Sequence, residues 1–504
     1  MSSCKKDING GSSAALEIIP ADAAFIISVD YETLVKKGKL NNLDNYAFMQ
    51  KLTERIVDGA LESTRELILN FVKDQSSLGL NPHTCYIFGL PSRQDGDKSL
   101  NVFAVFNITK QSVLEENVRK IDKSIKIEDS GVFKKAKRGE GSDLPFAWNK
   151  EVAIISFKEI FYDDFDSLFE KKTSITNDES FSEFLGKRGD FKIWFKYCNL
   201  FDLSEKFDVT PAERQFLTDI FGKINNLISI NFENGNIRFD CKAFPKSEVN
   251  RVNEKYPVWK DDFNDELLGD FPEETFMLFK FAVNVKDCIR LLNELKMFDS
   301  RNHSPFDDPE VQRIANALAG DFVIDVEGFA DGFMPVPLVS FGFTVTDRQG
   351  FENILSLIPS KNLSKSGDVY MVTVPGIPII SIFIAEKDNR VIVSNNQKHI
   401  EAFSGRGLDK SLKSSELLAK HKNSVNFSYI NLNFNTYPLS IRGLLNNISK
   451  NSENITTILN RLHSYTSWQE DKYTFGGSLK FTDVSTNSLQ ILLEIIDDIS
   501  TMVD

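Results

Sequence analysis

The stretch VFAVFNITKQSVLEENVRKI, residues 102–121, decides the fold because a second stretch of the chain resembles it. Residues 339–358, VSFGFTVTDRQGFENILSLI, align with it at a constant offset of 237 residues and without a gap. Internal similarity of this kind is the signature of a duplicated structural unit. The identical positions are Val102/Val339, Phe106/Phe343, Thr109/Thr346, Glu115/Glu352 and Ile121/Ile358.

Three further pairs of blocks follow the same order in both halves of the chain. Upstream, IIPADAAFIISV (18–29) aligns with DFPEETFMLFKF (270–281) through Pro20 and Pro272. Downstream, FAWNKEVAIIS aligns with FIAEKDNRVIVS, and SEFLGKRGDFKIWFKY aligns with SELLAKHKNSVNFSYI. Four pairs in one order predict two copies of one module, rather than a coincidence of apolar patterns.

The periodicity inside each module is mixed. Residues 191–197 alternate apolar and polar side chains, as half-buried antiparallel strands do. We therefore expect an α+β fold of two tandem similar modules, each a mainly antiparallel sheet covered by helices. The expected domains are a flexible lipoprotein-type tether (1–16), a first module (17–245), a linker (246–269) and a second module (270–504). Prolines and the acidic run DDFNDE mark the linker.

Local signals predict several element boundaries. Apolar side chains spaced three or four apart predict a long helix over 48–71. Helices are expected to begin after Thr210 and after Asp308, each followed by proline, and the second to close at Gly320. Hairpin turns are expected at Asn234-Gly235 and at residues 470–472.

Composition narrows the range of partners. The formal net charge of −13 argues against binding a phosphate backbone, which depends on clustered Lys and Arg. No apolar window of about 18 residues predicts a membrane-spanning helix. The chain has 42 Phe but 4 Trp and 11 Tyr, a balance that weighs against a sugar-stacking platform.

The N-terminal residues MSSC match the last four positions of a bacterial lipoprotein signal, with Cys4 as the residue to be acylated. The following KKDINGGSS suits a flexible tether. The apolar region that precedes such a box is not in this sequence. We expect lipidation at Cys4 and an outer-membrane lipoprotein of the cell envelope, facing the periplasm or the surface. A cytosolic protein that starts at Met1 is the other interpretation.

Four features of the sequence are shared with a known family. They are the Cys-Lys-Lys-Asp start, the strand IPADAAFIISVD with Pro20, the similar segment at Pro272 and a length near 500 residues. The chain resembles an uncharacterised Bacteroides lipoprotein family, called domain of unknown function 4836. The resemblance covers essentially the whole chain. It implies an envelope lipoprotein and no particular chemistry.

The remaining cysteines and the histidines form no local signature. Cys85, Cys198, Cys241 and Cys288 lack zinc-ligand spacing, and Cys198 and Cys241 are either paired or buried free thiols, with free thiols favoured. The histidines are also isolated, so only a cluster assembled in space would give a catalytic site. They are His83, His303, His399, His421 and His463.

The acid-rich run 162–170, with interleaved Phe165, Leu168 and Phe169, is interpreted as an amphipathic helix with a solvated acidic face rather than as a catalytic pair. The second acid-rich run, 261–270, falls mostly in the expected linker. We therefore predict no catalytic, cofactor-binding or metal-binding residue. The sequence favours a non-enzymatic binding or scaffolding protein of the envelope, whose ligand or partner protein is unidentified. The alternative is a glycan or peptide hydrolase whose site is assembled from residues distant in sequence.

Overall fold

The structure is a computed structural model, and it forms two compact units. Unit 1 comprises residues 1–245 and 483–504, and unit 2 comprises residues 246–482. The residues that the structure describes are 14–40, 46–51, 75–91, 100–121, 124–137, 143–157, 163–170, 173–178, 181–197, 211–294, 308–330, 335–373, 381–448 and 451–503.

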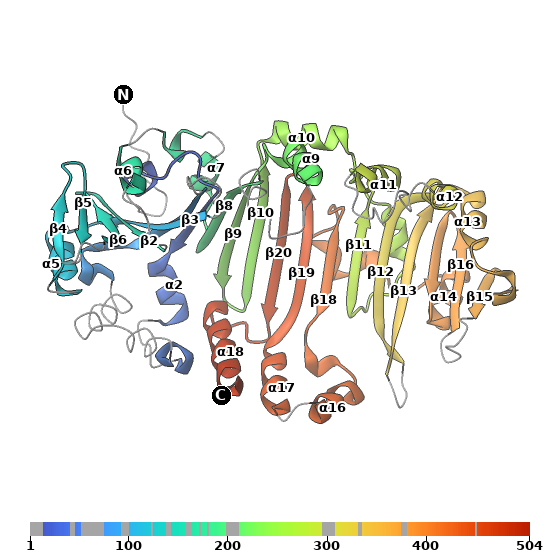
Figure 1. The fold of residues 1–504 in the computed structure, drawn as a ribbon. Coiled ribbons are helices and arrows are strands. Elements are labelled where there is room, and N and C mark those ends of the chain that lie inside the picture. Colours follow the sequence, from blue (N-terminus) through green and yellow to red (C-terminus); the bar gives the residue numbers. More distant parts are fainter. Residues whose placement is uncertain are drawn as a thin grey trace. The chain divides into compact units, whose positions relative to one another are not determined.

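The strands of unit 1 pair in the order β4-β5-β6-β7-β3-β2-β1-β8-β9-β10, and every one of these pairings is antiparallel (Figure 1). The chain therefore places β1 between two strands that come much later in sequence. The strands are β1 (Phe25–Asp30), β2 (Leu80–Pro91), β3 (Leu100–Ile108), β4 (Lys126–Asp129), β5 (Lys134–Lys137), β6 (Asp143–Trp148), β7 (Val152–Ser156), β8 (Phe191–Lys196), β9 (Asn225–Glu233) and β10 (Asn236–Phe244).

The strands of unit 2 pair in the order β14-β15-β16-β17-β13-β12-β11-β18-β19-β20, again antiparallel throughout. This is the order of unit 1 with each strand number raised by ten. The strands are β11 (Met277–Ala282), β12 (Leu318–Ala330), β13 (Val336–Val345), β14 (Leu363–Ser366), β15 (Val369–Thr373), β16 (Ser381–Lys387), β17 (Arg390–Ser394), β18 (Phe427–Asn431), β19 (Leu462–Asp471) and β20 (Thr474–Phe481).

Helices cover the sheet of each unit. In unit 1 they are α1 (Ala14–Glu17), α2 (Tyr31–Gly38), η2 (Gln75–Leu78), α5 (Gln111–Ile121), α6 (Asp163–Phe169), η3 (Ile175–Asn177), α7 (Phe181–Gly186), α9 (Pro211–Phe221) and α18 (Ser488–Val503). In unit 2 they are α10 (Lys246–Lys255), η5 (Asp265–Asp270), α11 (Val285–Glu294), α12 (Pro309–Ala317), α13 (Arg348–Leu355), η7 (Ser360–Asn362), α14 (Gln397–Ser404), η8 (Leu412–Ser414), α15 (Glu416–Ala419), η9 (Phe434–Thr436), α16 (Leu439–Ile448) and α17 (Ser452–Arg461).

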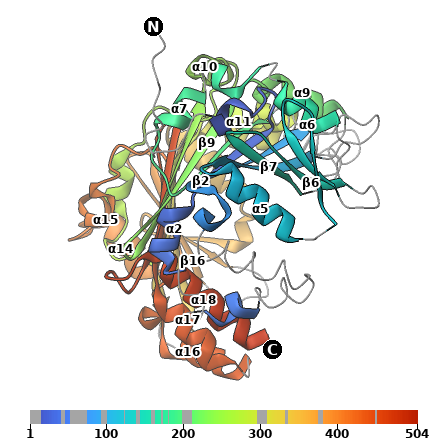
Figure 2. The ribbon, with the colours of Figure 1, turned by 90° about the vertical axis from the view of Figure 1, so that its left-hand side faces the viewer.

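Each unit contains two hydrophobic clusters. In unit 1, α5 inserts Leu114 and Val118 into a cluster with Trp148, and Figure 2 shows this helix lying against the strands. The second cluster of unit 1 joins strand residues such as Phe88 to helices α6 and α7. In unit 2, α13 inserts Phe351 into the matching cluster, while η5, α14 and α15 contribute to the other one. Neighbouring residues of one strand, such as Phe103 and Ala104 or Phe322 and Val323, belong to different clusters, so helices pack on both faces of each sheet.

Most of the local boundaries predicted from sequence are confirmed. Helix α9 begins at Pro211, and α12 begins at Pro309, where the Asp308 side chain accepts a hydrogen bond from Glu310 N. The turn at Asn234-Gly235 joins β9 to β10, with Gly235 at φ +62°. The helix expected over 48–71 lies mostly outside the described residues.

Two local predictions are wrong in detail. Helix α12 ends at Ala317, so Gly320, at φ +100°, lies inside β12 rather than at the helix end. The second hairpin turns at Lys472 and Tyr473, because Asp471 still pairs with Thr474. In β8 burial alternates along the strand as expected, and Lys192 and Trp194 are its most buried side chains because α7 packs on their face.

The α+β class with antiparallel sheets is confirmed, whereas the two-module organisation stays a prediction. Residues 246–269, expected as a linker, carry α10 and most of η5 and belong to unit 2. The C-terminal helix α18 belongs to unit 1. There Ser488 Oγ donates a hydrogen bond to Asn236 O at 2.9 Å.

Gly342 in β13 provides a test of how closely Phe271 packs on this strand. A Cβ atom at this position would lie 2.5 Å from the Phe271 ring, so Gly342→Ala should destabilise unit 2 by about 1–3 kcal/mol. The control is Gly443→Ala in α16, where a Cβ meets no atom within 4 Å. This variant should increase the free energy of unfolding by about 0.5–1 kcal/mol, because alanine favours a helix more than glycine does. Chemical denaturation measures both, and equal stabilities of the two variants would contradict the packing described.

Candidate ligand-binding site

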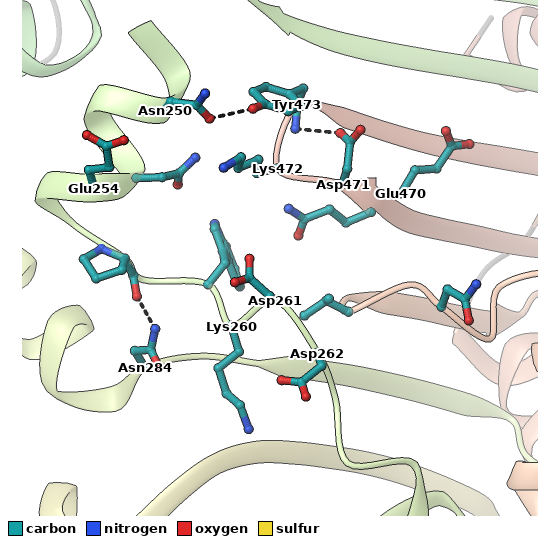
Figure 3. Close-up of a pocket in the computed structure, with 16 residues that line it drawn as sticks. Asn250, Glu254, Lys260, Asp261, Asp262, Asn284, Glu470, Asp471, Lys472 and Tyr473 are labelled. Atoms are coloured by element: carbon teal, nitrogen blue, oxygen red, sulfur yellow. Dashed lines mark hydrogen bonds between the residues drawn. The ribbon is translucent and has the colours of Figure 1, made fainter. Parts of the chain in front are cut away.

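A pocket of about 600 Å³ opens in unit 2 between α10, the segment that follows it, and the turn that joins β19 to β20 (Figure 3). A volume of this size lies within the range of about 300–1,000 Å³ typical of small-molecule sites. The lining residues are Asn250, Asn253, Glu254, Pro257, Trp259, Lys260, Asp261, Asp262, Asn284, Asn423, Val425, Gln469, Glu470, Asp471, Lys472 and Tyr473.

One wall of the pocket is the β19–β20 turn held against α10. Asp471 Oδ1 accepts a hydrogen bond from Tyr473 N at 2.8 Å, which shapes the turn. The Tyr473 hydroxyl donates to Asn250 Oδ1 at 2.5 Å, and Lys246 Nζ lies 5.0 Å from the centroid of the Tyr473 ring. The turn and the helix are therefore fixed relative to each other without filling the space between them.

The opposite wall is the segment between α10 and η5. Trp259 forms an isolated β-bridge with Val283, and the Asn284 side chain donates to Pro257 O. Lys260 Nζ forms an ion pair with buried Asp321 at 2.8 Å. In Figure 3 the Lys260 side chain accordingly points away from the other lining residues.

Several polar groups of the pocket have no partner among the described residues. Gln469 is 4% exposed, and its Oε1 accepts a hydrogen bond from Asn426, while its Nε2 donates to no described group. Asn253 and Asn423 also make no hydrogen bond through their side chains in the described part of the chain. Trp259 presents an aromatic surface that is 41% exposed. The pocket thus offers free hydrogen-bonding groups beside an aromatic ring.

The electrostatic character of the pocket is negative. Lys260 is neutralised by Asp321, so Lys472 remains as the cation among the lining residues. The lining carboxylates are Glu254, Asp261, Asp262, Glu470 and Asp471. A negative lining disfavours anionic ligands.

The corresponding turn of unit 1 is closed. Gly235 N donates a hydrogen bond to Thr486 O at 2.8 Å, and Asn487 Nδ2 donates to Phe232 O at 2.9 Å. A Cβ atom on Gly235 would lie 2.6 Å from Val484 Cα. The segment before α18 therefore packs directly on this turn.

A second polar cluster lies buried inside unit 2, around His399. Its Nδ1 lies 2.5 Å from Glu327 Oε1 and 2.8 Å from Ser340 Oγ, and its Nε2 lies 2.6 Å from Asp270 O. Glu327 sits at a β-bulge, where the pairing of β12 with β13 shifts register between Val326 and Gly328. A bulge can redirect a side chain into a core.

The cluster favours a charged His399. Burial alone would lower the pKa of His399, but hydrogen bonding and the charge of Glu327 outweigh burial and raise it. Burial alone would raise the pKa of Glu327, yet His399 and Ser340 lower it. Both ring nitrogens face acceptor oxygens, as an imidazolium requires. Nearby Asp325 has a pKa raised to about 7 by burial, and its Oδ2 has no hydrogen-bond partner.

The geometry of this cluster does not match a catalytic triad. In a triad the acid and the nucleophile hydrogen-bond to different nitrogens of the histidine. Here Glu327 and Ser340 share Nδ1, and Nε2 faces a main-chain carbonyl. Ser340 has no exposed surface, so a substrate has no access to its hydroxyl. The cluster is a buried structural network.

The residues singled out in the sequence are scattered through the structure. Cys4, Cys198 and His303 lie outside the described residues, so lipidation at Cys4 stays a prediction. Cys85, Cys241 and Cys288 are free thiols, which agrees with the free thiol favoured for Cys241. Burial raises the pKa of Cys85 to about 12 and that of Cys288 to about 11, which makes both poor nucleophiles.

Three of the other histidines are also far from any catalytic arrangement. His83 contacts Glu32, His463 Nδ1 lies 3.0 Å from Ser464 Oγ, and His421 packs on Trp468 with a ring-centroid distance of 4.4 Å. Within the described residues, no group of three or more His, Cys, Asp or Glu side chains is placed to hold a metal ion.

The helix expected from the first acidic run is confirmed. Residues 163–169 form α6, whose Phe165 and Leu168 are buried in the core. The second run is helical only from Asp265, and Asp261 and Asp262 line the pocket instead. The sequence did not predict the pocket, because the segments that form the walls of the pocket are far apart in sequence. The local signal was a Trp and a Pro beside acidic residues in an expected linker.

These observations define the class of the protein as an α+β protein of two antiparallel units, the second of which carries a polar pocket. A family model matches residues 16–489, and the chain belongs to the family described as Domain of unknown function (DUF4836). A comparison with curated proteins found no match, and neither did a comparison with solved structures. The described part of the chain contains no helix with the length and apolarity needed to cross a bilayer.

The His399 network predicts a specific pattern of stability. Glu327→Leu alone leaves a buried imidazole without its acid and should cost about 3–5 kcal/mol, whereas Glu327→Leu with His399→Leu should recover most of the loss. Since the pKa of folded His399 is raised, its stabilisation is complete below about pH 6.5, the unfolded value, and is lost as the pH rises through the folded value.

Chemical denaturation of the three proteins as a function of pH measures this pattern. The wild type should lose stability as the pH rises above about 6.5, because the pKa of folded His399 is raised, and the double variant should lose less. A double variant that is no more stable than Glu327→Leu would show that the pair is not the source of the effect.

Proposed function

We propose that this protein is a non-enzymatic binding protein of the cell envelope and that the unit 2 pocket receives its ligand. The observation that carries the proposal is a pocket whose lining includes polar groups without partners, in the described residues, and an exposed Trp259. No His or Cys is among its lining residues, so a nucleophile paired with a histidine base is absent from that lining.

The hydrolase alternative keeps one supporting feature, the carboxylates of the pocket. Acid-base hydrolysis of a glycan needs two carboxyl groups that face the same bond. In Figure 3, Asp261 points toward the middle of the lining residues, whereas Asp262 and Glu470 point away from it. The arrangement therefore supports binding better than cleavage.

We also propose that the two units descend from one duplicated module. The support is the common pairing order together with the registers of individual residues. Phe25 pairs with Gly89 and Gly89 with Val102, while Met277 pairs with Val326 and Val326 with Val339. Pro20 bridges Ser174 as Pro272 bridges Ser411. The aligned sequence blocks thus occupy matching places in both sheets.

The envelope location of the proposal depends on Cys4. The sequence MSSC followed by a polar Gly- and Ser-containing segment supports an acylated residue and its tether. Lipidation of this kind would hold the folded units at a membrane surface.

Ligand binding is tested by saturation-transfer NMR of the full chain with neutral oligosaccharides, acidic oligosaccharides, short peptides and polyamines. At least one class should give signals that disappear in Asn253→Trp, which fills the pocket. The matched control Gln312→Trp, in a separate pocket beside α12, should leave them unchanged. Each compound should be recovered intact by mass spectrometry. Cleaved compounds would favour the hydrolase, and silence from all classes would refute the proposed function.

The anchor is tested in the native host by expressing the gene with its own upstream sequence. The protein should partition with membranes and incorporate a labelled fatty acid, and Cys4→Ala should abolish the label and release the protein. The control Cys288→Ala changes a half-buried thiol and should keep both properties. An unlabelled, soluble wild-type protein would contradict the anchor.

A further inference from the structure

We infer that the unit 2 pocket binds a neutral oligosaccharide. This inference rests on the proposed binding function and names the chemical class of the ligand. Three properties of the described pocket support it: an exposed aromatic ring, a lining dominated by amides and carboxylates, and the absence of a free positive field that would attract acids.

The exposed ring is that of Trp259. An indole that is 41% exposed beside a pocket offers a flat apolar surface, on which the C–H face of a sugar ring can pack. The low total of Trp and Tyr weighed against a sugar-stacking platform in the sequence, but a total does not say where each ring lies. One Trp at the pocket meets the requirement of a single stacking site.

The hydrogen-bonding groups match those of sugar hydroxyls. Each hydroxyl both donates and accepts, and side-chain amides and carboxylates together supply acceptors and donors. Ten of the sixteen lining residues are Asn, Gln, Asp or Glu, so most of the pocket can pair with hydroxyls. The aliphatic lining is limited to Pro257 and Val425, which argues against a ligand with large apolar side chains.

Gln469 separates a saccharide from a cationic ligand. The carboxylates of the pocket alone would also attract a polyamine. However, Gln469 is 4% exposed, and the engagement of Oε1 by Asn426 leaves its Nε2 as an unpaired donor. A protonated amine has no acceptor for that donor, whereas a hydroxyl or ring oxygen has one. This nitrogen can pair with water in the absence of a ligand, and a ligand with oxygen acceptors can take the place of that water.

The electrostatics also separate neutral from acidic saccharides. Five carboxylates line the pocket, and of its two lysines Lys260 is engaged by Asp321. In Figure 3, Asp261 and Asp471 come from opposite walls, so a uronic acid would meet negative charge on both sides. We therefore expect discrimination against acidic sugars.

The experiment is isothermal titration of the full chain with cellotriose, maltotriose, mannotriose and triacetylchitotriose, compared with trigalacturonate and spermidine. At least one neutral trisaccharide should bind. Trp259→Ala should weaken that binding by about tenfold, while Trp259→Phe should keep most of it. The control Phe157→Ala removes an exposed aromatic ring in unit 1 and should change nothing.

Two results would overturn the inference. One is binding of spermidine or trigalacturonate with no binding of any neutral trisaccharide. The other is trisaccharide binding that Trp259→Ala leaves unchanged. If short peptides bind in the pocket and saccharides do not, the saccharide inference fails while the proposed binding function stands. Failure of every class of compound would refute both.

Discussion

The fold of each unit depends on one strand whose backbone is paired on both sides with strands distant in sequence. In unit 1, β1 lies between β2 and β8, and in unit 2, β11 lies between β12 and β18. A buried strand has to satisfy every main-chain donor and acceptor. Because both partners lie far away in sequence, forming the two pairings of this strand closes long loops, and the other strands of the sheet lie outside these central pairings.

The two units use this frame differently. Unit 1 has the paired residues Phe88 and Phe103 in its core, where the matching register of unit 2 pairs Asp325 with Ser340 and the bulge adds Glu327. Apolar side chains at these positions need no partners, whereas the polar set requires His399 and its hydrogen bonds. The hairpin turns of the two units also differ. The β9–β10 turn of unit 1 is packed against the segment before α18, whereas the β19–β20 turn of unit 2 borders a pocket. Among the described residues, unit 2 therefore has a buried polar network at sheet positions where unit 1 is apolar.

The sequence predicted what depends on local pattern or on repetition. Pro211 and Pro309 fix helix starts by their own geometry, and Asn234-Gly235 does the same for a turn, so these boundaries could be read directly. The family and the α+β class were also predictable, the family from the N-terminal motifs and the length, and the class from the mixed periodicity of the apolar residues. The bulge at Glu327 and the meeting of Asn250 with Tyr473 could not be predicted, since both depend on residues far apart in sequence.

Hydrogen exchange followed by mass spectrometry tests the central claim, that both units are built around an equivalent internal strand. The account predicts that peptides covering β1 and β11 exchange most slowly in their units, and that the β4–β5 and β14–β15 hairpins exchange much faster. Fast exchange in either β1 or β11, at the rate of those hairpins, would contradict it.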